Sequence, residues 1–247
     1  MVTVADTAFS IAVVRAEESA RAERLFEDPY AHMFQPTEPD AIEATNRYLE
    51  LPLFREIIRL RTRFIDDAIR ALGGLRQLVV LGTGFDTRAL RMPELADTRI
   101  FEIDFADQLE RKRSFLDAGG ITLPNRVVYV ACDFSGDWEP RLLAELEAHG
   151  FHRGAGAMFV WEGVIGYIDG PAIDRSLAFM VRAGGPTTRV AFTWAQPSID
   201  PDSLEQRTTR AGFTRCEDVG SDELWRRHLP GEPPFIATMS RLAIAEV

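Results

Sequence analysis

One segment of the chain constrains the fold more than any other. Leu78–Leu81 is a short apolar run followed by a turn that contains Gly82 and Gly84, which is typical of a buried parallel strand that runs into a tight turn. Glycine lets the backbone bend sharply and lets a ligand lie directly against the main chain. A second apolar run, Arg99–Ile103, ends at Asp104, twenty positions after Gly84. A carboxylate there can accept hydrogen bonds from both hydroxyls of a ribose, so this segment predicts an adenosine site.

The rest of the chain predicts the architecture around this segment. Residues 1–74 are helical in pattern and end in two glycines, so we expect an N-terminal helical cap over residues 1–74. Residues 75–247 alternate strands and helices, which predicts an α/β fold with a doubly wound, mostly parallel sheet of seven strands. The last strand, within Phe235–Ile244, alternates in part and is expected to be antiparallel. We expect the cap and residues 75–247, a Rossmann-like binding domain, to form one structural unit.

Acidic residues follow two further expected strands. Asp133 comes after the strand at 126–131, and Glu162 comes after the strand at 157–161. Doubly wound sheets bind ligands beyond the carboxyl ends of their strands, so both carboxylates should lie on the same edge as Asp104. Each has a plainer explanation alone, Asp133 as a helix cap and Glu162 as the partner in a buried ion pair.

Composition excludes several classes of partner. The net charge of -10 opposes binding to a phosphate backbone, so we expect no nucleic-acid partner. No run approaches the ~20 apolar residues of a membrane span, and we expect no membrane partner. Two cysteines, Cys132 and Cys216, form no disulfide framework and fit a reducing compartment. We therefore expect a cytoplasmic protein that acts on a small molecule without a metal ion, and a homo-oligomer is compatible with the sequence.

The charge around the glycine turn favours one adenosine ligand over another. The third glycine of the dinucleotide fingerprint is replaced by Thr87, and Asp86 beside the turn would repel a diphosphate. S-adenosylmethionine carries an ammonium and a sulfonium, both of which favour nearby carboxylates. The sequence thus favours S-adenosylmethionine over a nicotinamide cofactor. A nicotinamide-dependent oxidoreductase and a non-catalytic scaffold with the same fold remain alternatives.

Six motifs follow one another along the chain: D-P-Y-A (28–31), R-T-R-F-I-D-D (61–67), L-G-T-G-F-D-T-R (81–88), F-E-I-D-F (101–105), C-D-F with a following D-W (132–138) and W-E-G-V-I-G-Y (161–167). In this order they resemble the motifs of the S-adenosylmethionine-dependent methyltransferases related to leucine carboxyl methyltransferase, which include actinobacterial and polyketide-tailoring members. The resemblance covers most of the chain and implies a class I methyltransferase fold.

The resemblance also implies roles for the cofactor-binding residues. Arg61 would hold the carboxylate of S-adenosylmethionine, with Arg63 as the second candidate, and Glu162 would lie near the amino acid part of the cofactor. Residues at the other strand ends would hold the remainder of the cofactor: Gly82 and Gly84 the methionine part, Asp104 the ribose, and Asp133 with Phe134 the adenine.

The acceptor side is less constrained by the sequence. Tyr167 would face the substrate, and Tyr30, fixed behind Pro29, is either ordinary packing or part of the substrate pocket. A carboxylate acceptor is already ionised at neutral pH and needs no base, whereas a phenol benefits from one. His32 is the histidine we would test as that base, so Tyr167 and His32 are the catalytic candidates.

The expected function is O-methylation of a small-molecule carboxylate or hydroxyl, with secondary metabolism as a setting. One departure from the family concerns the substrate. Only about ten residues separate Trp194 from Leu204, where family members carry a longer segment. Part of the usual lid over the substrate is therefore missing or replaced.

Overall fold

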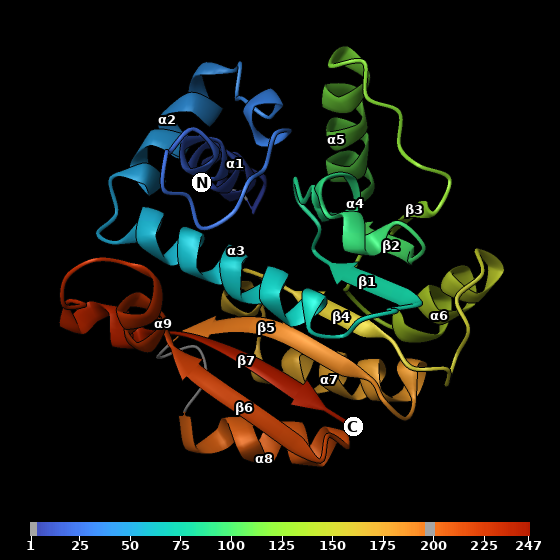
Figure 1. Cartoon of the computed structure of the whole chain (residues 1–247). Coiled ribbons are helices and arrows are strands. Elements are labelled where there is room, and N and C mark those ends of the chain that lie inside the picture. Colours follow the sequence, from blue (N-terminus) through green and yellow to red (C-terminus); the bar gives the residue numbers. More distant parts are fainter. Residues whose placement is uncertain (1–3, 196–200) are drawn as a thin grey trace.

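The structure, a computed structural model, describes residues 4–195 and 201–247 (Figure 1). Its α-helices are α1 (Val4–Ser19), α2 (Pro39–Leu49), α3 (Phe54–Arg70), α4 (Arg88–Arg91), α5 (Ala106–Ala118), α6 (Glu139–Ala148), α7 (Gly170–Gly184), α8 (Pro201–Ala211) and α9 (Ser221–His228). Its strands are β1 (Gln77–Leu81), β2 (Arg99–Asp104), β3 (Val127–Ala131), β4 (Met158–Trp161), β5 (Arg189–Ala195), β6 (Arg215–Gly220) and β7 (Ser240–Glu246). Short 3-10 helices occur at η1 (Ala31–Met33), η2 (Pro93–Leu95), η3 (Ile165–Tyr167) and η4 (Phe235–Met239).

The strands form one sheet in the order β3-β2-β1-β4-β5-β7-β6. β1 pairs in parallel with β2 on one side and β4 on the other, and β7 runs antiparallel to both β5 and β6. The chain therefore builds the sheet outward from β1 to β3, then crosses over to β4. This confirms the predicted seven-stranded, doubly wound sheet. The crossover places the switch point, where such sheets bind ligands, at the carboxyl ends of β1 and β4.

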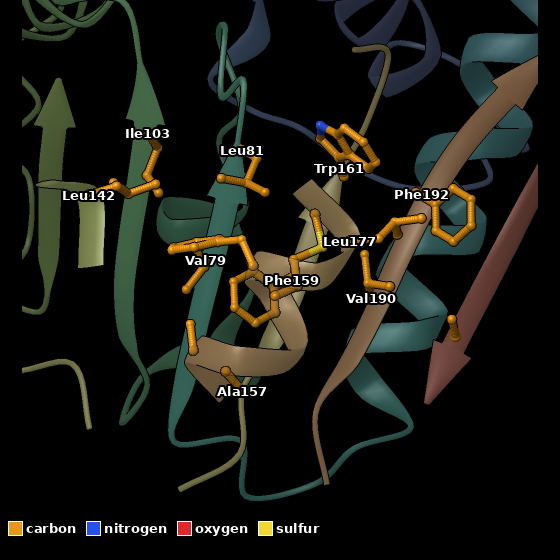
Figure 2. Packing of buried hydrophobic residues seen from close by; sticks show 14 of the residues in the cluster. Val79, Leu81, Ile103, Leu142, Ala157, Phe159, Trp161, Leu177, Val190 and Phe192 are labelled. Carbon is orange, nitrogen blue, oxygen red and sulfur yellow. The ribbon is translucent and has the colours of Figure 1, made fainter. Parts of the chain in front are cut away.

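Side chains of β1 pack on both faces of the sheet, which explains its unbroken apolar sequence. Val79 and Leu81 point to the face covered by α7, where Figure 2 shows them near Phe159 and Leu177. The alternate residues, Leu78 and Val80, pack on the opposite face in a cluster that includes residues of α3. Because β1 is held from both sides, the turn at its end starts from a fixed position.

The three helices that precede β1 occupy two different positions in the fold. α3 lies along one face of the sheet and supplies Ile65 and Ile69 to the core there. α1 and α2 pack against each other, and α1 lies over the carboxyl end of β1 (Figure 1). α1 is thus in a position to cover a ligand. The predicted boundary at residue 74 stays a prediction, since α3 and the sheet share one hydrophobic cluster.

Some predicted elements differ from the structure. The last strand was expected within Phe235–Ile244. In the structure Phe235–Met239 forms the 3-10 helix η4, and the strand β7 begins at Ser240. The helical pattern expected over residues 1–74 is interrupted after α1, which ends at Ser19. Helix α9 was not predicted, although acidic residues in its first turn and basic residues in its last turn suit a short helix.

The shortened segment after Trp194 includes residues 196–200, which lie outside the described residues. Among the helices that the structure describes, none combines the length and the hydrophobicity needed to cross a lipid bilayer.

Candidate active site at the switch point of the sheet

A cavity of about 440 Å³ opens at the carboxyl ends of β1, β2 and β4, within the size range of small-molecule sites. Its walls come from the glycine turn after β1, the start of α5, the segment after β4 and one side of α1. The lining residues are Thr7, Ala8, Ile11, Arg15, Arg61, Val80, Gly82, Thr83, Gly84, Phe85, Asp86, Asp104, Phe105, Asp107, Gln108, Phe134, Glu162, Gly163, Val164, Tyr167 and Ile168. The predicted strand ends at 82, 104 and 162 therefore meet around one cavity.

The glycine turn is held by hydrogen bonds to β2. The backbone N–H groups of Gly82 and Thr83 both donate to the Ile103 carbonyl, at 2.9 and 3.0 Å. Gly82 has a φ of 69°, and a Cβ on it would lie 2.5 Å from Cγ2 of Val164. Glycine is therefore needed there for both conformation and space. The turn brings the main chain directly to the cavity wall.

Asp104 lies at the end of β2 with its carboxylate already oriented. Its two oxygens accept backbone N–H groups from Gly84 and Phe105, each at 2.8 Å. Burial raises the pKa of Asp104, and these two hydrogen bonds only partly offset that effect. Each oxygen keeps a further lone pair that can accept a hydroxyl of a ribose. Phe105 and Phe134 line the same cavity and offer aromatic surface for an adenine ring.

Arg61 and Glu162 form an ion pair in the cavity wall. Nε of Arg61 lies 2.7 Å from Oε1 of Glu162, and the guanidinium of Arg88 donates to Oε2 at 2.9 Å. Burial opposes ionisation of Glu162, but Arg88 and Arg61 outweigh it and lower the pKa of the carboxyl. The wall thus presents one cation and one anion side by side, which complements the carboxylate and ammonium of an amino acid group.

A buried network of charges supports this pair. Arg88 is 2% exposed and bonds to Asp66 and Asp86 as well as to Glu162. Asp66 also accepts two hydrogen bonds from Arg91, at 2.7 and 2.8 Å. Four guanidiniums and four carboxylates are connected in this way: Arg15, Arg61, Arg88, Arg91, Asp28, Asp66, Asp86 and Glu162.

The network explains why the sequence motifs occur together. Asp28 of the D-P-Y-A turn accepts from the hydroxyl of Thr87 at 2.7 Å and pairs with Arg15 at 3.1 Å. Asp66 of the 61–67 motif pairs with Arg88 of the glycine-turn motif. The sequence analysis gave no supporting role to Asp28, Asp66 or Arg88. Asp66 is fully buried. Its place on the apolar side of α3, among Ile65 and Ile69, was the available signal.

Helix α1 forms the remaining wall of the cavity. The hydroxyls of Thr7 on α1 and Tyr167 after β4 are hydrogen-bonded at 2.9 Å. Burial raises the pKa of Tyr167, so its phenol stays protonated at neutral pH and is a poor base. This contact joins the N-terminal helix to the expected substrate side of the cavity.

The predicted site residues divide into two groups. Seven of them line the cavity: Arg61, Gly82, Gly84, Asp104, Phe134, Glu162 and Tyr167. Asp133, Tyr30 and His32 are absent from its lining. Asp133 is exposed and accepts the backbone N–H of Ser135 at 2.9 Å, and His32 is exposed on η1. Their predicted roles in adenine binding, substrate binding and catalysis stay predictions.

The second arginine candidate lies away from the cavity. Nε of Arg63 bonds to Asp67 at 2.6 Å, and its guanidinium also donates to the Leu25 carbonyl. Between the two arginines, only Arg61 contributes to the cavity wall.

The residues of this cavity fit S-adenosylmethionine. Four lining residues are carboxylates and two are arginines: Asp86, Asp104, Asp107 and Glu162 against Arg15 and Arg61. A wall with this excess of negative charge favours a ligand with net positive charge over a diphosphate. Asp86 is paired with Arg88, and its lowered pKa keeps it ionised. The repulsion predicted from Asp86 alone is therefore weakened, and the argument depends on Asp104 and Asp107, which line the cavity and do not belong to the ion-pair network described above.

Comparison with solved structures places the fold in a class. A crystal structure of a protein described as a methyltransferase from Thermobifida fusca YX superposes with a TM-score of 0.64 at 14% identity, covering 99% of this chain and 94% of that one. The chain therefore has the class I methyltransferase fold, with a cavity at its switch point.

Sequence comparison identifies the family. Residues 8–181 match the family described as leucine carboxyl methyltransferase. A relative in Parafrankia sp. (strain EAN1pec), named as an S-adenosyl-L-methionine-dependent methyltransferase, is 34% identical over 239 residues, covering 94% of this chain and 74% of the relative. A relative in Frankia alni with the same description is 33% identical over 224 residues, covering 88% of this chain and 78% of the relative. The chain belongs to the leucine carboxyl methyltransferase family, and S-adenosylmethionine is its cofactor. The oxidoreductase and scaffold alternatives are thereby set aside.

Proposed function

We propose that this methyltransferase transfers the methyl group to the oxygen of a small-molecule carboxylate. The observation that carries this proposal is the absence of a suitable base among the described residues that line the cavity. None of them is a histidine, lysine or cysteine, and the phenol of Tyr167 has a raised pKa. A carboxylate acceptor is ionised at neutral pH and requires no proton removal.

The acidic residues of the wall support the same conclusion. Arg88 holds Asp86 and Glu162 as ion pairs, which lowers the pKa of both carboxyls and makes them weak bases. Asp104 is engaged by two backbone N–H groups and faces the position proposed for the ribose. Asp86, Glu162 and Asp104 are therefore poorly suited to accept the proton of an alcohol or phenol. The fourth carboxylate of the wall, Asp107, is exposed and accepts the backbone N–H of Gln108 at 3.0 Å.

The cofactor, when bound, supplies a methyl group activated by its sulfonium. The chain's own contribution is alignment and exclusion of water. Arg61 and Glu162 would hold the amino acid part, and Asp104 would hold the ribose. α1 and Tyr167 would shield the reacting atoms. Opposite charges on donor and acceptor neutralise each other during transfer, so a cavity that solvates ions poorly favours the reaction.

The acceptor class can be tested with matched pairs of compounds that differ only in bearing a carboxylate or a hydroxyl. We expect methyl transfer to the carboxylates, with kcat/KM roughly constant, within about threefold, between about pH 6 and pH 8.5. Transfer to the alcohols or phenols with a rate that rises through this range would contradict the proposal and point to a base. The actinobacterial relatives suit a role in secondary metabolism, which stays a prediction.

A further inference from the structure

Two glutamines are fully buried among the described residues, and they differ in one respect. Gln77, at the start of β1, is 2% exposed and has three hydrogen bonds: its Nε2 donates to the His152 and Gly156 carbonyls, and its Oε1 accepts the N–H of His152. Gln108, on α5, is 7% exposed and lines the cavity. Neither its Oε1 nor its Nε2 has a hydrogen-bond partner in the protein. A buried carboxamide without partners is rare enough in proteins to require an explanation.

The position of Gln108 suggests what its partner is. Helix α5 runs back over β2 in the opposite direction. Two side chains four positions apart on the helix can therefore lie near two side chains two positions apart on the strand. Lys112 pairs with Glu102 in the interior, and both are at most 2% exposed. Gln108 lies one helical turn before Lys112 and four positions after Asp104 in the sequence. Both Gln108 and Asp104 line the cavity. The inner pair is complete within the protein, whereas the pair at the cavity is left with hydrogen-bonding capacity toward a ligand.

We propose that Gln108 recognises the ribose of the cofactor together with Asp104. A carboxylate can only accept hydrogen bonds, so Asp104 uses the hydroxyl protons of the ribose and leaves the hydroxyl oxygens as free acceptors. The Nε2 group of Gln108 donates to one of these oxygens. The two side chains thus satisfy the donor and the acceptor side of the same sugar edge. This inference rests on the proposed cofactor position but not on the identity of the methyl acceptor.

The test compares Gln108→Leu with Gln77→Leu, which makes the same change at an equally buried position outside the cavity. Binding of S-adenosylhomocysteine is measured by calorimetry and stability by thermal denaturation. We expect Gln108→Leu to weaken binding by about 5- to 10-fold, the effect of one hydrogen bond. The melting temperature of this variant without ligand should be unchanged or about 2 °C higher, because a buried polar group without partners has been removed.

The control should show the opposite pattern. Gln77→Leu breaks three hydrogen bonds and should lower the melting temperature while leaving affinity within about twofold. If Gln108→Leu also lowered the melting temperature and left affinity unchanged, Gln108 would be a structural residue and the proposal would be overturned. Gln108→Met serves as the second variant if the leucine does not fit the site.

The ribose assignment is tested with the 2′-deoxy and 3′-deoxy forms of S-adenosylhomocysteine. Removal of the hydroxyl that Gln108 contacts should weaken binding to the wild type more than binding to Gln108→Leu. The loss of affinity in the wild type should exceed the loss in the variant by about 5-fold or more. Equal penalties in both proteins for both analogues would overturn the ribose assignment. Because no acceptor is present, these outcomes are independent of the test for carboxylate methylation.

Discussion

The buried network behind the cavity makes a quantitative prediction for Asp66→Asn. Asp66 is fully buried and accepts one hydrogen bond from Arg88 at 2.8 Å and two from Arg91 at 2.7 and 2.8 Å. The substitution keeps the shape of the side chain but removes the charge that compensates two buried guanidiniums. Breaking a buried ion pair from one side costs about 3 to 5 kcal/mol. At 2 to 4 °C for each kcal/mol in a chain of this size, the melting temperature should fall by roughly 6 to 20 °C.

The neighbouring residue provides a matched control. Asp67 is on the same helix and pairs with Arg63 and Arg70, but its side chain is 42% exposed. Exposed ion pairs contribute about 0 to 1 kcal/mol, so Asp67→Asn should change the unfolding free energy by no more than about 1 kcal/mol. Both variants are measured by urea denaturation at pH 7. Equal losses, or a loss below about 1 kcal/mol for Asp66→Asn, would refute the reasoning from burial.

The same comparison predicts a pH dependence. Burial opposes ionisation of Asp66, but Arg88 and Arg91 outweigh it and hold its pKa below the ordinary value of an aspartate. A carboxyl with a lowered pKa stabilises the fold above its pKa in the unfolded chain and loses that contribution as the pH falls through its folded value. The difference in unfolding free energy between wild type and Asp66→Asn should therefore have its full size at neutral pH. It should become smaller only in acid, below the ordinary pKa of an aspartate.

Two further predictions concern the cofactor. Arg61→Ala should weaken binding of S-adenosylhomocysteine by about 10-fold or more but leave binding of 5′-methylthioadenosine, which lacks the amino acid part, unchanged; Arg63→Ala should stay within about twofold for both ligands in calorimetry. An effect of Arg63→Ala alone would reverse the assignment. Asp104→Asn should weaken S-adenosylhomocysteine binding by about 10-fold at pH 7. Burial raises the pKa of Asp104 whereas ion pairs lower those of Asp86 and Glu162, so wild-type affinity should fall first as acid protonates Asp104. An identical fall in Asp104→Asn would assign that titration to another group.

Much of the site followed from the sequence because it depends on residues next to strand ends. Gly82, Asp104 and Glu162 each follow an apolar run directly, and parallel strands bring their carboxyl ends to one edge of a sheet. The local pattern therefore placed these residues at one edge before any long-range contact was known. The same reasoning placed Asp133 there, but its side chain turns back to the N–H of Ser135 and is exposed. A strand end fixes where a residue is, whereas its neighbours decide where the side chain points.

The contributions of α1 and the first loop could not be predicted in this way. The contact between Thr7 and Tyr167 joins residues 160 positions apart, and no local pattern signals such a pairing. Asp28 was passed over in the sequence for the same reason, since its partners Arg15 and Thr87 belong to other elements. Helix periodicity indicates an apolar face but does not say what covers it.

The sequence by itself determined the sheet, the residues that follow the ends of its strands and the class of cofactor. It could do so because apolar periodicity, glycine turns and charge act over a few residues. Only the tertiary structure decided which of two arginines reaches the cavity, which aspartate of the 66–67 pair is buried, and that Gln108 has no partner within the protein. These choices depend on how separate elements pack, and burial changes the free energy of the same charged or polar group by several kcal/mol.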